Sequence, residues 1–368
     1  MSFVLANGML LLLVLLEACF VQWVKKEQIP WKEVIFNLNS GHILMWVLRG
    51  VEISVYHMVT DYASLQMTAD WPYWATFLLC FVAWDFGFYW LHRFHHKIKL
   101  LWAIHVVHHE GEHFSLSLGI RNSWYSSLSS IPFFLLLAVI GIPTEVFLLV
   151  SSIHYSVQFY NHNSIVRNSG VLDTFLVTPK HHKVHHGKNP QYIDKNFGGT
   201  LLLWDKLFGT FQKEDEEVQC GVKDYKPSYD VLWANNLPFL RLLSLSWKKV
   251  MPPRGRDHFP DSLIALGGVL LFLLLLAYIH IENVWMPLPK FIFFLIIFLS
   301  TLSCGFLSEG RRVGVGIWSL CMFVLWPITL FYFDIHDWWM WVLLLLSMTY
   351  GVFLFIFKSK VSKQNVNV

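Results

Sequence analysis

The chain has 368 residues, of which 55% are hydrophobic and only 14% are charged, and its formal net charge is +3. Ordinary soluble domains carry roughly 25% charged residues, so this chain lacks the polar residues to cover a soluble fold, and a bilayer must cover part of it. The five cysteines form no CxxC pair, so neither a disulfide framework nor a thiolate metal site is expected. The small net charge gives no sign of a nucleic-acid partner, and we expect none.

Three apolar stretches near the N-terminus predict membrane spans. The first, residues 9–24, ends at Lys25-Lys26 with no small-residue cleavage site after it, so we interpret it as a membrane anchor rather than a cleaved signal peptide. The second, about 42–65, carries three charged residues and is a weaker span. The third, about 74–91, leads directly into the first histidines.

The stretch 131–160 is apolar and is interrupted at Gly141-Ile142-Pro143, which predicts a helical hairpin that enters the membrane and returns to the same side. Residues 163–260 are polar, and no span is expected there. Four further spans are predicted at about 262–281, 289–307, 313–333 and 338–357.

Positive charge sets the expected topology. Lys and Arg gather in alternate loops, and the loops between them hold Asp and Glu. By the positive-inside rule, the N-terminus lies outside, whereas the histidines and the C-terminus face the cytoplasm. We therefore expect a multi-pass protein of the endoplasmic reticulum if the source is eukaryotic, or of the inner membrane if it is bacterial.

Histidine is concentrated in one third of the chain: 13 of the 18 histidines lie between His92 and His186. They form an HxxxH box that starts at His92 and two HxxHH boxes that start at His105 and His182. On a helix, positions i and i+4 share a face one turn apart, so each box can present a pair of imidazoles. Including one histidine at the end of the hairpin, the expected metal ligands are His92, His96, His105, His108, His109, His162, His182, His185 and His186.

This number of ligands predicts two ions, because one ion takes roughly four to six ligands. A lone HxxxH is more often a surface or core feature, but three boxes within about a hundred residues are not explained that way. One HExxH occurs, at His109–His113, but the other two boxes carry no glutamate, so neither the zinc-protease helix nor the carboxylate-rich di-iron bundle, which uses two ExxH pairs, accounts for the three boxes. A histidine-rich pair beside a bilayer fits iron that activates O₂, although spacing alone does not separate iron from zinc.

Other histidines have different expected roles. His95 is off the face of its box, so we expect it to point outward or to support a ligand, and His181 is adjacent to a better-placed neighbour. His113 and His154 are either supporting partners of ligands or ordinary polar residues. Five isolated histidines are interpreted as structural: His42, His57, His258, His280 and His336.

The segment 84–211 resembles the fatty acid hydroxylase superfamily, which includes the sterol desaturases. The resemblance rests on WDFGFYWLHRFHH, WAIHVVHH, TPKHHKVHHGKN, DKNFGG and WDKLFGTF. Within the superfamily, the TPxHHxVHHGxN form and the additional C-terminal spans resemble the alkylglycerol monooxygenases. The implied fold is an all-α, polytopic membrane protein with a cytoplasmic helical cap over a histidine-rich di-metal site.

The resemblance also implies an activity and its partners. It implies two ferrous ions, molecular oxygen and a membrane lipid, with hydroxylation of the ether-linked carbon of an alkylglycerol and tetrahydrobiopterin as reductant. The product would break down into a fatty aldehyde and a glycerol. Sterol or fatty-acyl hydroxylation or desaturation, fed by a separate electron donor, is the alternative within the superfamily.

Three further residues are predicted to contribute to catalysis. Asp85 lies seven positions before His92 on the same helix face, so it could orient a ligand imidazole or instead cap the helix or pair with Arg93. Asp194 and Asn196 match the flanking motif of the superfamily and could support ligands, as could Asp205.

The expected organisation has four parts: membrane spans in 1–72, the catalytic domain in 73–215, a linker in 216–260 and a four-span membrane region in 261–368. Two functions of other classes remain open. A divalent-metal transporter would place its ligands near the midplane of the spans, and a bis-histidine haem protein would pair histidines on facing spans. Both fit less well, because these boxes lie at the ends of spans.

Overall fold

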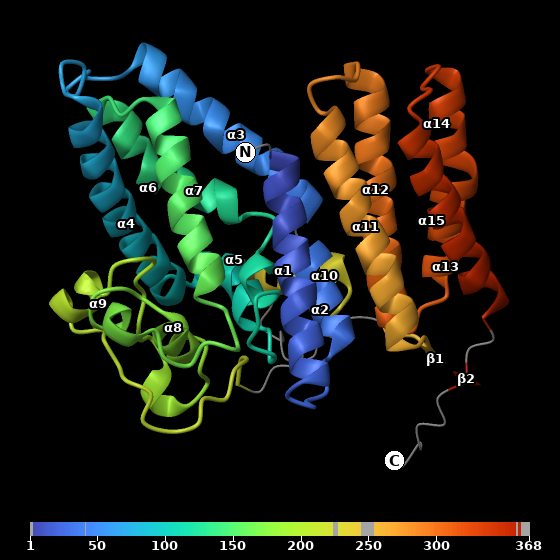
Figure 1. The fold of residues 1–368 in the computed structure, drawn as a ribbon, viewed down its shortest axis with the longest axis horizontal. Helices are drawn as coiled ribbons and strands as arrows, with labels where there is room; N and C mark the ends of the chain where they lie inside the picture. The colour runs from blue at the N-terminus through green and yellow to red at the C-terminus, as the bar shows by residue number, and fades with distance from the viewer. Residues whose placement is uncertain (1–2, 41, 224–226, 244–253, 358–359, 362–368) are drawn as a thin grey trace. The chain divides into compact units, whose positions relative to one another are not determined.

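The computed structural model describes residues 3–40, 42–223, 227–243, 254–357 and 360–361, and it divides into two compact units (Figure 1). The histidine unit contains residues 44–226, and the other, the C-terminal unit, contains residues 1–43 and 227–368. The first two helices therefore belong with the C-terminal spans, whereas the sequence suggested one N-terminal part, 1–72. Pro252 and Pro253 of the expected linker lie outside the described residues.

The histidine unit is built from helices joined by short turns. Its elements are α3 (His42–Tyr62), α4 (Tyr73–Lys97), α5 (Lys99–His109), η1 (Leu118–Ile120), α6 (Ser126–Ile140), α7 (Thr144–Tyr160), η2 (Gly170–Thr174), α8 (Pro179–His185), η3 (Pro190–Tyr192) and α9 (Leu203–Leu207). The predicted hairpin is α6 and α7, and Gly141 ends α6 with a φ of 106°, a left-handed conformation that glycine adopts without strain.

The C-terminal unit holds most of the remaining apolar helices and one short strand pair. Its elements are α1 (Phe3–Trp23), α2 (Trp31–Asn39), α10 (Val231–Leu243), β1 (Asp257–His258), α11 (Asp261–Ile281), α12 (Pro287–Ser308), α13 (Val313–Leu320), η5 (Cys321–Leu325), α14 (Trp326–Tyr332), α15 (Trp338–Ile356) and β2 (Lys360–Val361). Strands β1 and β2 pair antiparallel, with Asp257 opposite Val361.

The expectation of a mostly helical membrane protein is confirmed. In the described residues, seven helical segments are long and apolar enough to cross a membrane, and they include α4 and the four predicted C-terminal spans. The span predicted at 313–333 is α13, η5 and α14 in succession. The π-helical turn of η5 comes immediately before Pro327, which has no backbone N–H to donate.

A buried aromatic stack joins α4 to the hairpin. The Trp84 ring stacks on Phe134 of α6, with ring centroids 4.8 Å apart, and on His154 of α7, with ring centroids 4.4 Å apart. The Trp84 indole N–H donates to Ser151 Oγ at 2.9 Å. Trp84 is completely buried, so this contact fixes α4 against α7 and sets where the C-terminal end of α4, with its histidines, lies.

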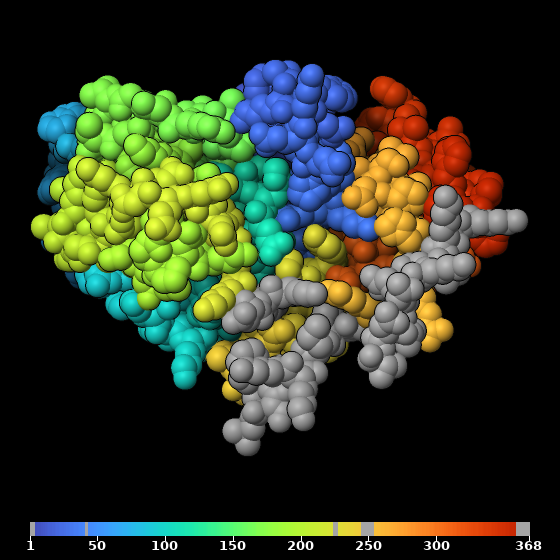
Figure 2. Space-filling view, turned by 90° about the horizontal axis from the view of Figure 1, so that it is seen from below, coloured from blue at the N-terminus to red at the C-terminus, as the bar shows by residue number. Residues whose placement is uncertain are grey.

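The segment after α7 folds over the ends of these helices. Its yellow-green surface forms a face of the histidine unit in Figure 2 and carries α8 and α9. Asp205 stabilises this segment, because the Asp205 carboxylate accepts hydrogen bonds from Phe197 N and Gly198 N, both at 2.8 Å. This segment brings the third histidine box to the first two.

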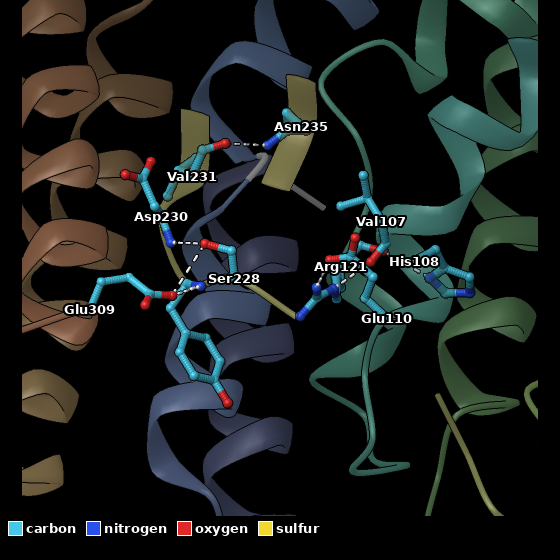
Figure 3. A network of polar contacts seen from close by, with 10 residues as sticks. Val107, His108, Glu110, Arg121, Ser228, Asp230, Val231, Asn235 and Glu309 are labelled. Carbon is cyan, nitrogen blue, oxygen red and sulfur yellow. Dashed lines mark hydrogen bonds and ion pairs between the residues drawn. The ribbon is translucent and has the colours of Figure 1, made fainter. Parts of the chain in front are cut away.

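The C-terminal unit has a polar network of its own at the end of α12. Glu309 Oε1 accepts hydrogen bonds from Tyr229 N at 2.6 Å and from Ser228 Oγ at 3.2 Å (Figure 3). Asp230 pairs with Arg311 at 2.8 Å. These bonds connect the chain before α10 to the end of α12.

Candidate metal centre

The nine predicted ligand histidines gather into two groups within the histidine unit. Group A is His92, His96, His105, His109 and His185, and group B is His108, His162, His182 and His186. In each group, one ring nitrogen from every member lies within 4.8 Å of the others. In the part of the chain that the structure describes, these are the two clusters of potential metal ligands.

Each HxxHH box contributes to both groups. In α5, His105 and His109 are one turn apart and belong to group A, while His108 points into group B. In the third box, His182 and His186 belong to group B and His185 to group A. Adjacent histidines on a helix point about 100° apart. The HH pair that ends each box therefore supplies one ligand to each of two neighbouring sites.

The spacing of the ring nitrogens in group A matches a coordination shell. His109 Nε2 lies 3.1 Å from His105 Nε2 and 3.1 Å from His185 Nε2. An ion with metal–nitrogen distances of about 2.0–2.1 Å holds neighbouring ligand nitrogens about 2.9–3.4 Å apart. The Nε2 atoms of His92 and His96 are buried and make no hydrogen bond. A metal ion at the centre of the group would satisfy them.

Three partners in the loop 194–197 orient the rings of group A. His92 Nδ1 donates to Phe197 O and His185 Nδ1 donates to Lys195 O, each at 2.8 Å. His96 Nδ1 lies 3.5 Å from Asp194 Oδ1. A proton held on Nδ1 leaves Nε2 with a lone pair, which is the form of imidazole that binds a metal.

Group B uses different partners for the same purpose. His108 Nδ1 donates to Arg121 O, and His162 Nδ1 donates to Gln158 O, both at 2.8 Å. The Nε2 atoms of these two rings then face each other at 3.3 Å, although both are acceptors. Two acceptors cannot hydrogen-bond each other, so the arrangement fits a cation between them.

Burial keeps these rings neutral. Desolvation, together with neighbouring imidazoles, holds the pKa values of His109, His185 and His186 well below 6.5. Burial also lowers the pKa of His108, to about 4. Neutral imidazole is the ligating form, so the residues present fit two metal ions.

Asp194 lies beside group A, as predicted. Its carboxylate accepts a hydrogen bond from Lys97 Nζ at 2.6 Å and lies against His96. The hydrogen bond from His96, with the Lys97 ammonium, holds the pKa of Asp194 at about 2. Asp194 therefore stays ionised under physiological conditions and can orient the His96 ring.

Asp85 lies elsewhere than predicted. Its carboxylate accepts hydrogen bonds from Thr200 N, Leu201 N and Trp204 Nε1, at 2.9–3.0 Å, and the described residues show none to the nine histidines. Arg93 does not pair with it and donates instead to Tyr89. Seven residues of helix separate Asp85 from His92 by about 10.5 Å, so Asp85 reaches the loop before α9 rather than a ligand ring.

Asn196 supports the loop through its backbone shape and its amide. Its φ is 53° and that of Asp194 is 59°, a left-handed conformation that Asn and Asp tolerate better than most residues. Its amide donates to His181 O and Gln212 O. Asn196 and Asp205 therefore shape the loop that carries the carbonyl partners of group A, and neither side chain touches a ligand ring in the described contacts.

Three other histidines of the region are structural neighbours of the two groups. His95 is buried, contacts Ser129 and stacks on His105 with ring centroids 5.0 Å apart, so it does not point outward. His181 caps the start of α8 through Thr178. His154 bonds to Thr200 Oγ1 at 2.6 Å.

The sequence reasoning missed Arg121, whose carbonyl orients His108. One signal was available: Arg121 is the only charged residue between Glu112 and Glu145. A charge in such a stretch is expensive to bury without a specific partner. The carbonyl partners of the other rings carry no side-chain signature.

Comparison with known proteins finds relatives of the region that contains this site. Residues 77–210 match the model of the family described as fatty acid hydroxylase. An alkylglycerol monooxygenase of Danio rerio is 38% identical over 218 residues, which are 57% of this chain and 48% of the relative. The alkylglycerol monooxygenase of Homo sapiens is 34% identical over 208 residues, 55% of this chain and 46% of the relative.

A bacterial protein is also similar. An ornithine lipid hydroxylase of Rhizobium tropici is 32% identical over 200 residues, which cover 51% of this chain and 59% of the relative. The chain spans about half the length of the curated relatives it matches. No solved structure matches it.

Proposed function

We propose, from the fatty acid hydroxylase domain that residues 77–210 form, that this chain is a di-iron, O₂-dependent membrane lipid monooxygenase that hydroxylates the ether-linked carbon of alkylglycerols. The observation that carries the proposal is the gathering of nine buried histidines into two adjacent groups within this domain. The similarity to alkylglycerol monooxygenases supports the choice of substrate.

The proposed reaction is balanced by an external reductant. One oxygen atom of O₂ enters the C–H bond beside the ether oxygen, and the other leaves as water after two electrons and two protons are supplied. The hemiacetal then breaks into a fatty aldehyde and a glycerol. We propose a tetrahydropterin as the source of the electrons, with a separate electron-transfer protein as the alternative.

The two iron ions, when bound, would supply the O₂ activation that no amino-acid side chain provides. The residues of this chain hold and orient them. Neutral imidazoles supply lone pairs at Nε2, and the carbonyls of Lys195, Phe197 and Arg121 fix which nitrogen carries the proton. Phe197 is fully buried against the His92 ring and helps to exclude water from the centre.

A lipid chain has a place to lie along α7. A groove of about 430 Å³ is lined by Ser152, Ile153, Ser156, Val157 and Tyr160. Helix α7 ends two residues before His162, so the groove runs along the helix that leads to group B. Each methylene kept out of water contributes about 0.8 kcal/mol, so long-chain amphiphiles should be turned over and short, water-soluble analogues should bind far more weakly.

Hydroxylation of a different polar lipid is a second candidate, because the chain is also similar to an ornithine lipid hydroxylase. Both candidates use the same centre and differ only in which carbon is presented to it. Supplying purified protein with each lipid class and identifying the products separates them.

We also propose that the histidine groups face the cytoplasm, as the loop charges predict. An exposed residue of the cap, Lys213, and one of the loop before α15, Asp334, offer a test. With cysteine introduced at each position, an impermeant thiol reagent should label K213C from the cytoplasmic side and D334C from the other side. Labelling of both from one side would overturn this topology.

The test of the proposed function is anaerobic purification, followed by metal quantification and product analysis. With an alkylglycerol, O₂ and a tetrahydropterin, we expect a fatty aldehyde and about two iron ions per chain. His108→Ala serves as the inactive control. Two bound ions without oxidation of any lipid supplied would contradict the proposed activity while leaving the metal centre intact.

A further inference from the structure

The turn Leu118–Arg121 lies against group B and touches two of its four ligands. His108 Nδ1 donates to the backbone carbonyl of Arg121 at 2.8 Å. Gly119 lies against His162, since a Cβ atom at Gly119 would be 3.0 Å from His162 Nδ1. No side chain larger than hydrogen fits here without a shift of the His162 ring. We propose that this turn is the positioning element of the group B metal site and that Arg121 locks it in place.

The lock is a buried ion pair. Arg121 Nη2 donates to Glu110 Oε2 at 2.8 Å, and both side chains are fully buried (Figure 3). Arg121 Nε donates to Val107 O at 2.5 Å. Glu110 is the residue that follows α5, and Val107 precedes His108 within it. The guanidinium thus connects the turn to both sides of the His108-His109 pair.

The shape of guanidinium is required for this role. Its rigid fork donates in two directions at once, to a carboxylate and to a carbonyl. A lysine ammonium at the same position could pair with Glu110, but its donors all sit on one nitrogen, which cannot occupy both the Nε position at Val107 O and the Nη2 position at Glu110. Arg121→Lys therefore keeps the buried charge beside Glu110 and removes the hydrogen bond to Val107 O.

Group A takes its known supports from another part of the unit. Three of its five rings have their Nδ1 partners in the loop 194–197, which Asp205 holds through Phe197 N. The supports are therefore largely separate, and a change at Arg121 should weaken metal binding at group B more than at group A, whose ligand His109 lies between Val107 and Glu110. Loss of such an outer partner typically weakens metal binding about 10–100-fold.

The inference rests on the two-metal centre of the proposed function and not on its lipid or reductant. It is tested by combining Arg121→Lys with variants that leave one site intact. His96→Ala removes a ligand of group A and leaves group B, whereas His182→Ala does the reverse. Arg167→Lys, at an exposed arginine of the same unit, is the matched control.

Each protein is purified with ferrous iron, dialysed and analysed for metal per chain by mass spectrometry, with no activity assay needed. Adding Arg121→Lys to His96→Ala should remove most of the remaining iron, whereas adding it to His182→Ala should leave most of the remaining iron bound. Gly119→Ala, which preserves the ion pair and displaces His162, should give the same pattern. Arg167→Lys should change neither.

Equal loss from both backgrounds, or no loss from either, would overturn the inference and leave the proposed function untouched. Absence of metal from the wild-type protein under the same conditions would overturn the metal centre, and with it both proposals. If Arg121→Lys does not fold, the Gly119→Ala result decides.

Discussion

Groups A and B hold similar ligands but are supported by different parts of the histidine unit. Group A takes i, i+4 pairs from α4 and α5, and the loop 194–197 orients its rings. Group B has one such pair, and its other two rings are held by carbonyls from the turn at Arg121 and from α7. Two ligand groups built from three helical boxes, two of them shared, can therefore be perturbed one at a time.

The comparison also explains the HxxHH spacing. A box with only HxxxH serves one site, as His92 and His96 do in group A. The additional histidine of HxxHH points to the other group, so the boxes in α5 and α8 bridge the two groups. This arrangement predicts that loss of a bridging box harms both sites, whereas loss of one ring harms one.

The largest effect is expected from removing one ligand of either group. His108→Ala in group B and His185→Ala in group A should each abolish lipid oxidation, since each site loses a ring that no neighbour can replace. Each variant should still insert into membranes and retain the ion of the other group. Metal quantification with a membrane-extraction assay checks this; loss of insertion would show that the ligand is needed for folding instead.

A smaller effect is expected from Asp194→Asn, which keeps the size of the side chain and removes its charge. Group A iron should bind about 10-fold more weakly, because the charged partner of His96 is lost. Group B should be unaffected. Competition with a chelator measures both affinities, and equal weakening of the two ions would contradict the separate supports.

The pH dependence of the metal-stripped protein follows from the buried histidines. The pKa of His108 falls from 6.5 in the unfolded chain to about 4 in the folded one, so the unfolded state binds more protons between these values. The contribution to stability is complete above about pH 6.5 and is lost as the pH falls toward 4. Thermal unfolding of the stripped protein should show this decline, and bound metal should move it to lower pH; a melting temperature that rises on acidification would contradict the burial of neutral rings.

The smallest effect is expected from His95→Ala, the control in the first box. His95 contacts Ser129 and stacks on His105, but it belongs to neither group. The variant should retain both ions and most of its activity. An inactive His95→Ala with an active His108→Ala would show that the ligand faces are assigned wrongly.

The sequence predicted which histidines gather into the two groups because their spacing is a local, helical property. The boxes at His92, His105 and His182 follow helix periodicity, so eight of the nine rings could be named before their partners were known, and His162 was added from its place at the end of the hairpin. The spans were also predictable, since residues 261–356 are nearly continuous apolar helix. The hydrogen-bond partners of the rings could not be predicted. They include the backbone carbonyls of Lys195, Phe197 and Arg121, and any residue type supplies such a carbonyl.

Asp85 shows the limit of reasoning from one helix. Its position on the face of His92 suggested a direct contact, but the face continues two turns away and meets the loop at Thr200 and Leu201 instead. Which partner a buried carboxylate finds depends on how distant segments pack, and helix periodicity does not contain that information.

The most direct test of the central claim is the iron content of anaerobically purified protein, compared among wild type, His96→Ala and His182→Ala. Two ligand groups with separate supports predict about two ions in the wild type and about one in each variant. One ion in the wild type, or loss of all iron in both variants, would contradict two separable metal sites.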